Sequence, residues 1–253
     1  MEPLEQLIVV GAGLGAGIVS SSIGVASLIS FPILVAVGLP PVVANASNTV
    51  GLIPAGLSGS FGYRRELAEH PAVTRAVLAT SAIGAVVGAF LLIRLPPGVF
   101  EAVVPWLILF ACLLVGFQPL ISRWARSRPS FDPDADRTLF SGRVTAASTV
   151  VGVYGGYFGA GQGVMLVAVM ALGLDLELRV VNALKTTAIM AANIVAGVIF
   201  VAIADLDWLA IGLLAVGSVV GGYVGSHVGR RLPPTVFRVL VVIAGVTAAV
   251  VML

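Results

Sequence analysis

Long apolar runs alternate with short stretches of glycine, proline and charge along the whole chain. Divided at this punctuation, the sequence contains about ten apolar segments. They are roughly 4–20, 25–38, 41–63, 72–94, 98–121, 140–158, 163–173, 178–203, 208–230 and 235–253. Most reach the roughly 20 residues that a helix needs to cross a bilayer, but 25–38 and 163–173 are too short to cross untilted. The pattern predicts an all-α polytopic membrane protein that contains two short helices.

Composition strengthens this interpretation and excludes other classes of protein. Hydrophobic residues make up 58 % of the 253 residues and charged residues only 10 %, whereas about a quarter of a soluble domain is charged. A water-soluble fold is therefore excluded, and the lipid bilayer is the expected surrounding. The net charge of +2 comes with no basic footprint for DNA or RNA, so no nucleic-acid partner is expected.

The chain contains an internal repeat, which appears without gaps at an offset of 137 residues (182 minus 45, from Asn182 and Asn45). At this offset the run Arg-Leu-Pro-Pro at 94–97 falls on Arg-Leu-Pro-Pro at 231–234. A four-residue identity at one ungapped offset indicates duplication of an ancestral unit. We expect a first transmembrane repeat at 1–121, a basic cytoplasmic linker at 122–139 and a second transmembrane repeat at 140–253.

The arginines predict that the two repeats have opposite orientations in the membrane. The loop after the third segment carries Arg64, Arg65 and Arg75 in the first half, but Asp205 and Asp207 in the second. Short basic loops stay cytoplasmic, so these equivalent loops lie on opposite sides and both termini are expected in the periplasm. Inverted repeats with broken or short helices near the midplane are typical of secondary transporters. The alternative for the basic linker is a lipid-binding patch.

Two interruptions of the apolar pattern occupy equivalent places in the halves. Residues 20–24 read Ser-Ser-Ser-Ile-Gly, and residues 155–163 read Gly-Gly-Tyr-Phe-Gly-Ala-Gly-Gln-Gly. Broken backbone is tolerated in lipid only where it is buried or lines a cavity, and the N-terminus of the short helix that follows attracts anions. We therefore expect both breaks to line one substrate site, with the candidates Ser21, Ser22, Gly24, Gly159, Gly161 and Gln162. The alternative is that they only permit close helix packing.

The third segment of each half carries polar side chains in an apolar setting. The candidate substrate ligands are Asn45, Asn48 and Thr49 in the first half and Asn182, Lys185 and Thr186 in the second. Lys185 is the only lysine in the chain and stands where the first half has Asn48. A charge inside an apolar span costs roughly 2.5–3.5 kcal/mol on insertion scales and indicates function by default. The alternative is a lysine that snorkels to the nearer interface.

Other glycines and prolines are interpreted as structural. The glycines at 84 and 88, and at 217, 221 and 225, recur at the four-residue spacing that lets two helices pack closely. Pro32, Pro54 and Pro105 lie inside apolar segments and are expected to kink them. None of these residues is a candidate for direct contact with a substrate.

The duplicated halves, the polar third segment and the glycine-rich break resemble the TauE/SafE sulfite exporter family over essentially the full length. The best match is 155–163 followed by Val-Met-Leu at 164–166, whereas the first half departs from it with serines at 20–22. The resemblance implies a carrier of the bacterial inner membrane that moves sulfite, sulfoacetate or a related organosulfonate and uses no cofactor. The serines leave the substrate preference open, because hydroxyls could replace backbone contacts.

The leading hypothesis is therefore export of a small sulfur-containing anion by alternating access. Uptake of a small oxyanion is an alternative in the same class, and a membrane-embedded assembly factor or enzyme is one in a different class. The enzyme hypothesis lacks residues, since the sequence has no HExxH motif, no paired carboxylates within a span and no Cys/His cluster. The sequence leaves transport direction, coupling ion and formation of a homo-oligomer open.

Overall fold

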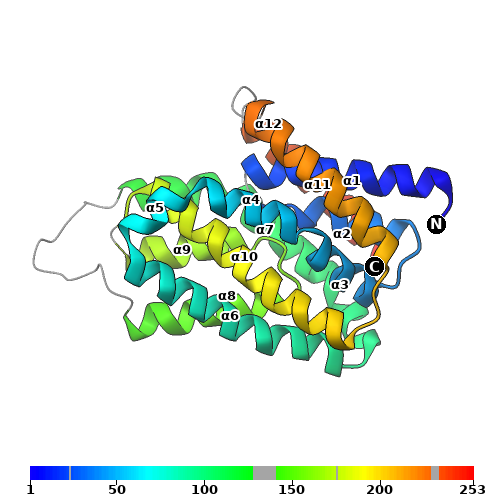
Figure 1. The fold of residues 1–253 in the computed structure, drawn as a ribbon, viewed down its shortest axis with the longest axis horizontal. Coiled ribbons are helices and arrows are strands. Elements are labelled where there is room, and N and C mark those ends of the chain that lie inside the picture. The colour runs from blue at the N-terminus through cyan, green and yellow to red at the C-terminus, as the bar shows by residue number, and fades with distance from the viewer. Residues whose placement is uncertain (23, 128–140, 175, 229–233) are drawn as a thin grey trace, which may run out of the picture.

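The computed structural model of the protein describes residues 1–22, 24–127, 141–174, 176–228 and 234–253, and these form a helical bundle (Figure 1). No strand occurs in these ranges. In chain order the helices are α1 (Pro3–Ser22), α2 (Ser27–Ala36), α3 (Pro41–Gly51), α4 (Ile53–Gly62), α5 (Arg64–Glu69), α6 (Pro71–Arg94), α7 (Pro97–Ser127), α8 (Gly142–Tyr157), α9 (Gln162–Gly173), α10 (Leu178–Ile203), α11 (Trp208–Val228) and α12 (Pro234–Met252). The predicted all-α class is confirmed.

Helix lengths separate the spanning helices from the short ones. Among the described residues, α1, α6, α7 and α10 are long and apolar enough to cross a membrane. In contrast, α2 has 10 residues and α9 has 12, which correspond to about 15 and 18 Å at a rise of 1.5 Å per residue. A hydrocarbon core of about 30 Å exceeds both lengths. The two short helices predicted from the sequence are therefore present, and they begin within one or two residues of the expected positions.

Helices of the two halves are interleaved. The first helix of each half packs along the fourth long segment of the other, as α1 against α11 and α6 against α8. The repeat offset exchanges these two pairs, because it relates α1 to α8 and α6 to α11. Two other elements pack against their own repeat equivalents across the halves, α7 against α12, and α3 and α4 against α10. Neither half buries its apolar faces without the other.

Glycines make the two interleaved helix pairs possible. A Cβ atom at Gly84 or Gly88 would overlap with backbone carbonyl oxygens of α8, and a Cβ atom at Gly217 or Gly221 would overlap with those of α1. The helix axes can approach this closely only because no side chain stands between them. The packing role predicted for these four glycines is confirmed, while the surroundings of Gly225 lie outside the described residues.

Two segment boundaries differ from expectation. The apolar segment 41–63 is divided into α3 and α4 at Leu52, two residues before Pro54. Proline has no N–H to donate and its ring crowds the preceding turn, so the predicted disturbance at this proline takes the form of a break. By contrast, α2 runs through Pro32 and α7 runs through Pro105 and onward to Ser127. Helix α7 thus extends six residues past the end expected at 121.

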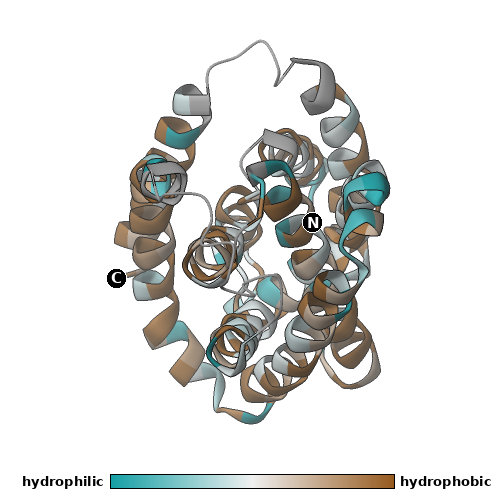
Figure 2. Cartoon of the chain, turned by 90° about the vertical axis from the view of Figure 1, so that its left-hand side faces the viewer, coloured by the Kyte–Doolittle hydropathy of each residue, from teal (hydrophilic) through white to brown (hydrophobic). Residues whose placement is uncertain are grey.

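The outer surface is apolar, as expected for a helical membrane protein (Figure 2). Large hydrophobic side chains such as Phe61, Trp106 and Val198 are exposed on the outside. The interior holds an aromatic cluster in which Phe31 of α2 stacks edge-on against Phe158, with ring centroids 5.3 Å apart, and against Phe100 of α7, at 6.3 Å. The protein is thus a multi-pass helical membrane protein with a well-packed core.

Contacts at the two ends of α10 show how it lies against α3 and α4. At its start, Arg179 forms ion pairs with Glu66 (3.7 Å) and Glu69 (3.6 Å) of α5. Beyond its end, the N–H of Asp207 donates to the hydroxyl of Ser47 in α3 at 3.0 Å. The third segment of the second half therefore runs antiparallel to that of the first. Both chain termini lie at the end of the bundle opposite α5 (Figure 1).

Candidate functional site

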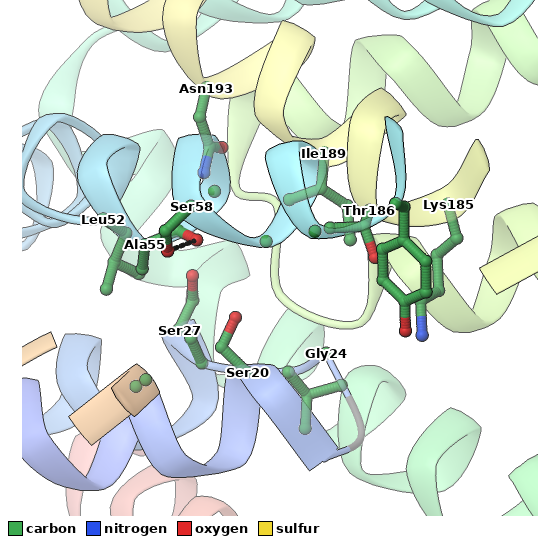
Figure 3. Close-up of a pocket in the computed structure, with 18 of the residues that line it drawn as sticks. Ser20, Gly24, Ser27, Leu52, Ala55, Ser58, Lys185, Thr186, Ile189 and Asn193 are labelled. Carbon is green, nitrogen blue, oxygen red and sulfur yellow. Dashed lines mark hydrogen bonds between the residues drawn. The ribbon is translucent and has the colours of Figure 1, made fainter. Parts of the chain in front are cut away.

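A cavity of about 890 Å³ is lined by residues of α1, α4, α10 and α11 and by both backbone breaks. The first break contributes residues 24–27 and the second contributes Gly159 and Ala160. The antiparallel third segments, with α4 beside α10, contribute one wall, which faces Ser20, Gly24 and Ser27 (Figure 3). The structure therefore brings together the two interruptions that are 137 residues apart in the repeat, as the sequence predicted.

Glycines at equivalent positions form the two breaks. Gly24 has φ +75° and its repeat partner Gly161 has φ +79°, both in the left-handed region that residues with a Cβ rarely adopt. The second break needs a further such residue, Gly159, with φ +80°. In addition, the hydroxyl of Tyr154 donates to the carbonyl of Ala160 at 2.6 Å. This break is thus held in place by its own helix.

Lys185 of α10 is the basic side chain of the cavity. It is 8 % exposed, and its stem packs against Gly163, where a Cβ atom would lie 3.0 Å from its Cδ. Its ammonium lies beside the first break, 3.3 Å from the position that a Cβ of Gly24 would take. Figure 3 shows the side chain extending from α10 toward this break. Lys185 therefore does not snorkel away from the interior.

The ammonium of Lys185 has little compensation from protein groups. It donates to Oδ1 of Asn182 at 3.3 Å, and no carboxylate within the described residues forms an ion pair with it. Glu66 also lines the cavity, but it pairs with Arg179. Thr186 lines the cavity as well, and its hydroxyl donates to the carbonyl of Asn182, which leaves oxygen lone pairs available. A buried cation without a counter-ion favours an anionic ligand.

The equivalent residues of the first half are used for packing. The amide of Asn48 accepts from Ser30 (2.5 Å) and donates to Ser27 (3.2 Å), both in α2. Asn45 donates to the carbonyl of Tyr157 at 2.9 Å, and so links α3 to the second break. The hydroxyl of Thr49 donates to the carbonyl of Asn45 at 2.9 Å. These three candidates lie behind the wall of the cavity rather than on its surface.

Two candidates of the second break also lie outside the cavity lining. Gln162 is 1 % exposed, packs on Gly155, and has no hydrogen-bond partner for either amide atom among the described residues. Gly161 faces Ala111 of α7. The side chains of the remaining candidates, Ser21 and Ser22, lie outside the described residues.

Several cavity residues were not among the sequence candidates. They are Ser20, Ser27, Ser58 and Asn193, which carry hydroxyl or amide groups. Asn193 offered a usable signal, because it lies eight residues after Lys185 and thus on the same helical face. Ser20 begins the first break, whereas Ser27 and Ser58 offered no signal, since serine is common in membrane helices and usually bonds to its own backbone. In the described residues, no group of His, Cys, Asp and Glu could hold a metal ion.

The sequence is similar to a known protein family and to membrane transporter proteins of other bacteria. The family described as "Sulfite exporter TauE/SafE" matches residues 9–252. A "Probable membrane transporter protein" of Haemophilus influenzae is 26 % identical over 234 residues, covering 91 % of this chain and 88 % of the relative. A "Probable membrane transporter protein ORF9" of Sinorhizobium sp. is 27 % identical over 241 residues, covering 93 % and 87 %. No solved structure matches. Because the family match spans nearly the whole sequence, the chain belongs to the TauE/SafE sulfite exporter family.

Proposed function

We propose that this membrane transporter exports a small sulfur-containing anion, such as sulfite, sulfoacetate or a related organosulfonate, across the bacterial inner membrane. The observation that carries the proposal is the ammonium of Lys185, which lies in the central cavity between both breaks without a carboxylate partner among the described residues. A sulfonate or sulfite bound there would neutralise the charge. The family description supports the choice of a sulfur oxyanion.

The mechanism we propose is alternating access between inverted repeats. The antiparallel course of α10 relative to α3 and α4, and the exchange of helix pairs between the halves, support an inverted arrangement. In such transporters one repeat rocks against the other around a fixed site near the midplane. The cavity has walls from both repeats, so rocking would alter its access to each side.

Flux into liposomes tests the substrate. Reconstituted protein should move sulfite, thiosulfate, sulfate and sulfoacetate to different extents, with a sulfur oxyanion favoured over acetate, and imposed pH and voltage gradients would reveal coupling. Protein-free liposomes are the control for leak. Transport of none of the sulfur anions above the leak, or equal transport of acetate, would contradict the proposal. Preference for influx under every gradient would instead favour an uptake carrier.

Single-cysteine labelling tests the orientation. In a Cys112→Ser background, Ala68→Cys in α5 and Asp205→Cys after α10 introduce exposed thiols at equivalent ends of the two third segments. The first should react with an impermeant maleimide only from the cytoplasm and the second only from the periplasm. A thiol at the C-terminus should behave like the second. Labelling of both loops from one side would exclude the inverted repeat.

A further inference from the structure

The two ends of the cavity differ in chemistry. One end contains Lys185 and Gly24, and the other contains Ser20, Ser27, Ser58 and Asn193 (Figure 3). None of these four side chains carries a charge. We call this second end the serine end; the sequence places Ser20 in a break expected to line the site, but assigns no role to Ser27, Ser58 or Asn193.

The ends are separated along one face of α10. Lys185, Ile189 and Asn193 follow one another at intervals of four residues and all line the cavity. At 1.5 Å per residue, the Cα atoms of Lys185 and Asn193 lie about 12 Å apart. The apolar side chain of Ile189 lies between the polar ends (Figure 3). One small ion cannot contact both ends at once.

Ser27 presents a hydrogen-bond donor to the serine end. The contact between Ser30 Oγ and Asn48 Oδ1 is 2.5 Å, and that between Asn48 Nδ2 and Ser27 Oγ is 3.2 Å. The shorter distance fits an O–H···O bond and the longer an N–H···O bond, which fixes the orientation of the amide. Ser27 therefore accepts from Asn48, and its own hydrogen is free to donate into the cavity.

The other groups of the serine end add acceptors. The hydroxyl of Ser58 donates to the carbonyl of Ala55 at 3.0 Å, so its lone pairs are available. Among the described residues, the side chains of Ser20 and Asn193 form no hydrogen bond with another protein group. A donor, an acceptor and an amide that offers both suit an uncharged hydrogen-bonding group such as a hydroxyl or an amide.

We propose that the serine end is a second subsite, and that the preferred substrate is an elongated organic anion with its anionic head at Lys185 and an uncharged hydrogen-bonding group at the serine end. This inference rests on the proposed function, because it assumes an anion at Lys185. The extent of the cavity supports it. The cavity, of about 890 Å³, extends continuously from Lys185 to the serine end, so an elongated anion can lie along it.

Binding of matched probes to the purified full-length protein tests the subsite. The probes are 4-hydroxybutane-1-sulfonate and pentane-1-sulfonate, which have the same length but differ in the terminal group, and sulfite as the compact anion. Ligand-dependent thermal stabilisation in detergent reports their affinities. We expect the hydroxyl probe to bind about tenfold more tightly than the alkyl probe, since the terminal methyl of the alkyl probe would displace water from the polar groups of the serine end without pairing with them.

Variants at two walls of the subsite locate the discrimination. Ser27→Ala and Asn193→Leu should each bring the affinity ratio of the two sulfonates to within about threefold, while sulfite binding stays unchanged. Ser148→Ala is the matched control, because Ser148 is a buried serine of α8 that does not line the cavity. It should keep the tenfold ratio. Ser27 lies in α2 and Asn193 in α10, so a folding defect in one variant need not occur in the other. A single variant that folds is enough to test whether the serine end discriminates between the two sulfonates.

The outcomes separate this inference from the proposed function. Equal affinity of the two sulfonates for the wild-type protein, or a ratio that neither variant changes, would overturn the subsite. If the subsite failed in this way but all three probes still required Lys185 for binding, the proposed function would stand without the subsite. If neither sulfite nor either sulfonate bound, the proposed function and the subsite would both fall.

Discussion

Asn48 and Lys185 occupy the same position of the two repeats, but Asn48 packs against its own half whereas Lys185 lines the cavity. The amide of Asn48 is held by two serines of its own half, Ser27 and Ser30 of α2. At the equivalent positions of α9 stand Val164 and Val167, which offer nothing to bond with. The side chain of Lys185 therefore leaves its own half and ends beside Gly24 of the other.

The difference shows how a duplicated scaffold can acquire one asymmetric site. Both halves keep the left-handed glycines at 24 and 161 and the interleaved helix pairs, although the third segment is divided into α3 and α4 in the first half and continuous as α10 in the second. The side chains that face the third segment are Ser27 and Ser30 in α2 but Val164 and Val167 in α9, and this difference decides that Asn48 packs inside its half whereas Lys185 reaches the cavity. We expect substitutions at equivalent positions to have unequal effects on binding but equal effects on packing.

The largest effect is expected from Lys185→Met, which removes the charge and keeps the apolar stem. A unit charge about 4 Å from an anion contributes roughly 4 kcal/mol at an effective dielectric near 20, before desolvation is subtracted. Affinity for sulfite should fall by about tenfold to hundredfold, while the protein still inserts and folds. Lys185→Arg should retain part of the affinity, because it keeps the charge with a different donor geometry. Thermal stabilisation by sulfite and flux in liposomes both measure the loss.

Wild-type affinity in Lys185→Met would mean that an anion binds through backbone dipoles alone. The monodisperse elution and melting temperature of the variant serve as the control for folding. A loss of binding that accompanies a loss of folding would be settled by Lys185→Arg, which preserves the charge in the cavity.

The next effect concerns the packing glycines, where the repeats should behave alike. Gly84 and Gly221 are equivalent by the offset, and a Cβ atom at either would overlap with a backbone carbonyl, of Thr149 or of Leu14. Gly84→Ala and Gly221→Ala should each destabilise the fold by about 1–3 kcal/mol, because the helices must move apart. Thermal unfolding in detergent measures this.

Gly116→Ala is the matched control, since nothing lies within 4 Å of a Cβ at this helical glycine. It should leave the melting temperature unchanged or raise it slightly. Tolerance of alanine at one packing glycine but not at its equivalent would contradict the symmetric packing of the two interleaved helix pairs.

Sequence reasoning succeeded where backbone and periodicity decide the outcome. The short helix α9 begins at Gln162, one residue before its expected start, and both breaks meet at the cavity. It was less successful with side-chain direction, because three or four residues on one helical face can point to a cavity or to a neighbouring helix. Asn45 and Asn48 bond to neighbouring segments, whereas Asn182 and Lys185 face the cavity. That choice depends on residues of the preceding short helices, α2 and α9, and for Asn45 on Tyr157 of α8, 112 residues away.

A smaller effect is expected from Asn48→Ala, which tests the packing side of the comparison. The substitution leaves the hydroxyls of Ser27 and Ser30 without their buried partner, and should lower stability by about 1–2 kcal/mol. Sulfite affinity should change less than threefold, since Asn48 does not line the cavity. Melting temperature and sulfite binding, measured on the same preparation as for Lys185→Met, distinguish the two positions. A loss of affinity as large as that of Lys185→Met would show that both halves share the anion equally.

The smallest effect is expected where the halves meet at α5, the short helix that the second half lacks. Arg179 pairs with Glu66 and Glu69 across the halves, but its side chain is 58 % exposed. Exposed ion pairs contribute about 1 kcal/mol or less, because solvent screens the attraction and both side chains lose freedom. Arg179→Gln should therefore lower stability by less than about 1 kcal/mol, and the difference should shrink at 1 M salt, where the Debye length is about 3 Å. Transport should continue, since Lys185 lies six residues farther along α10, about 9 Å away. A folded Arg179→Gln variant that binds sulfite but no longer transports it would instead assign the ion pair to the motion between repeats.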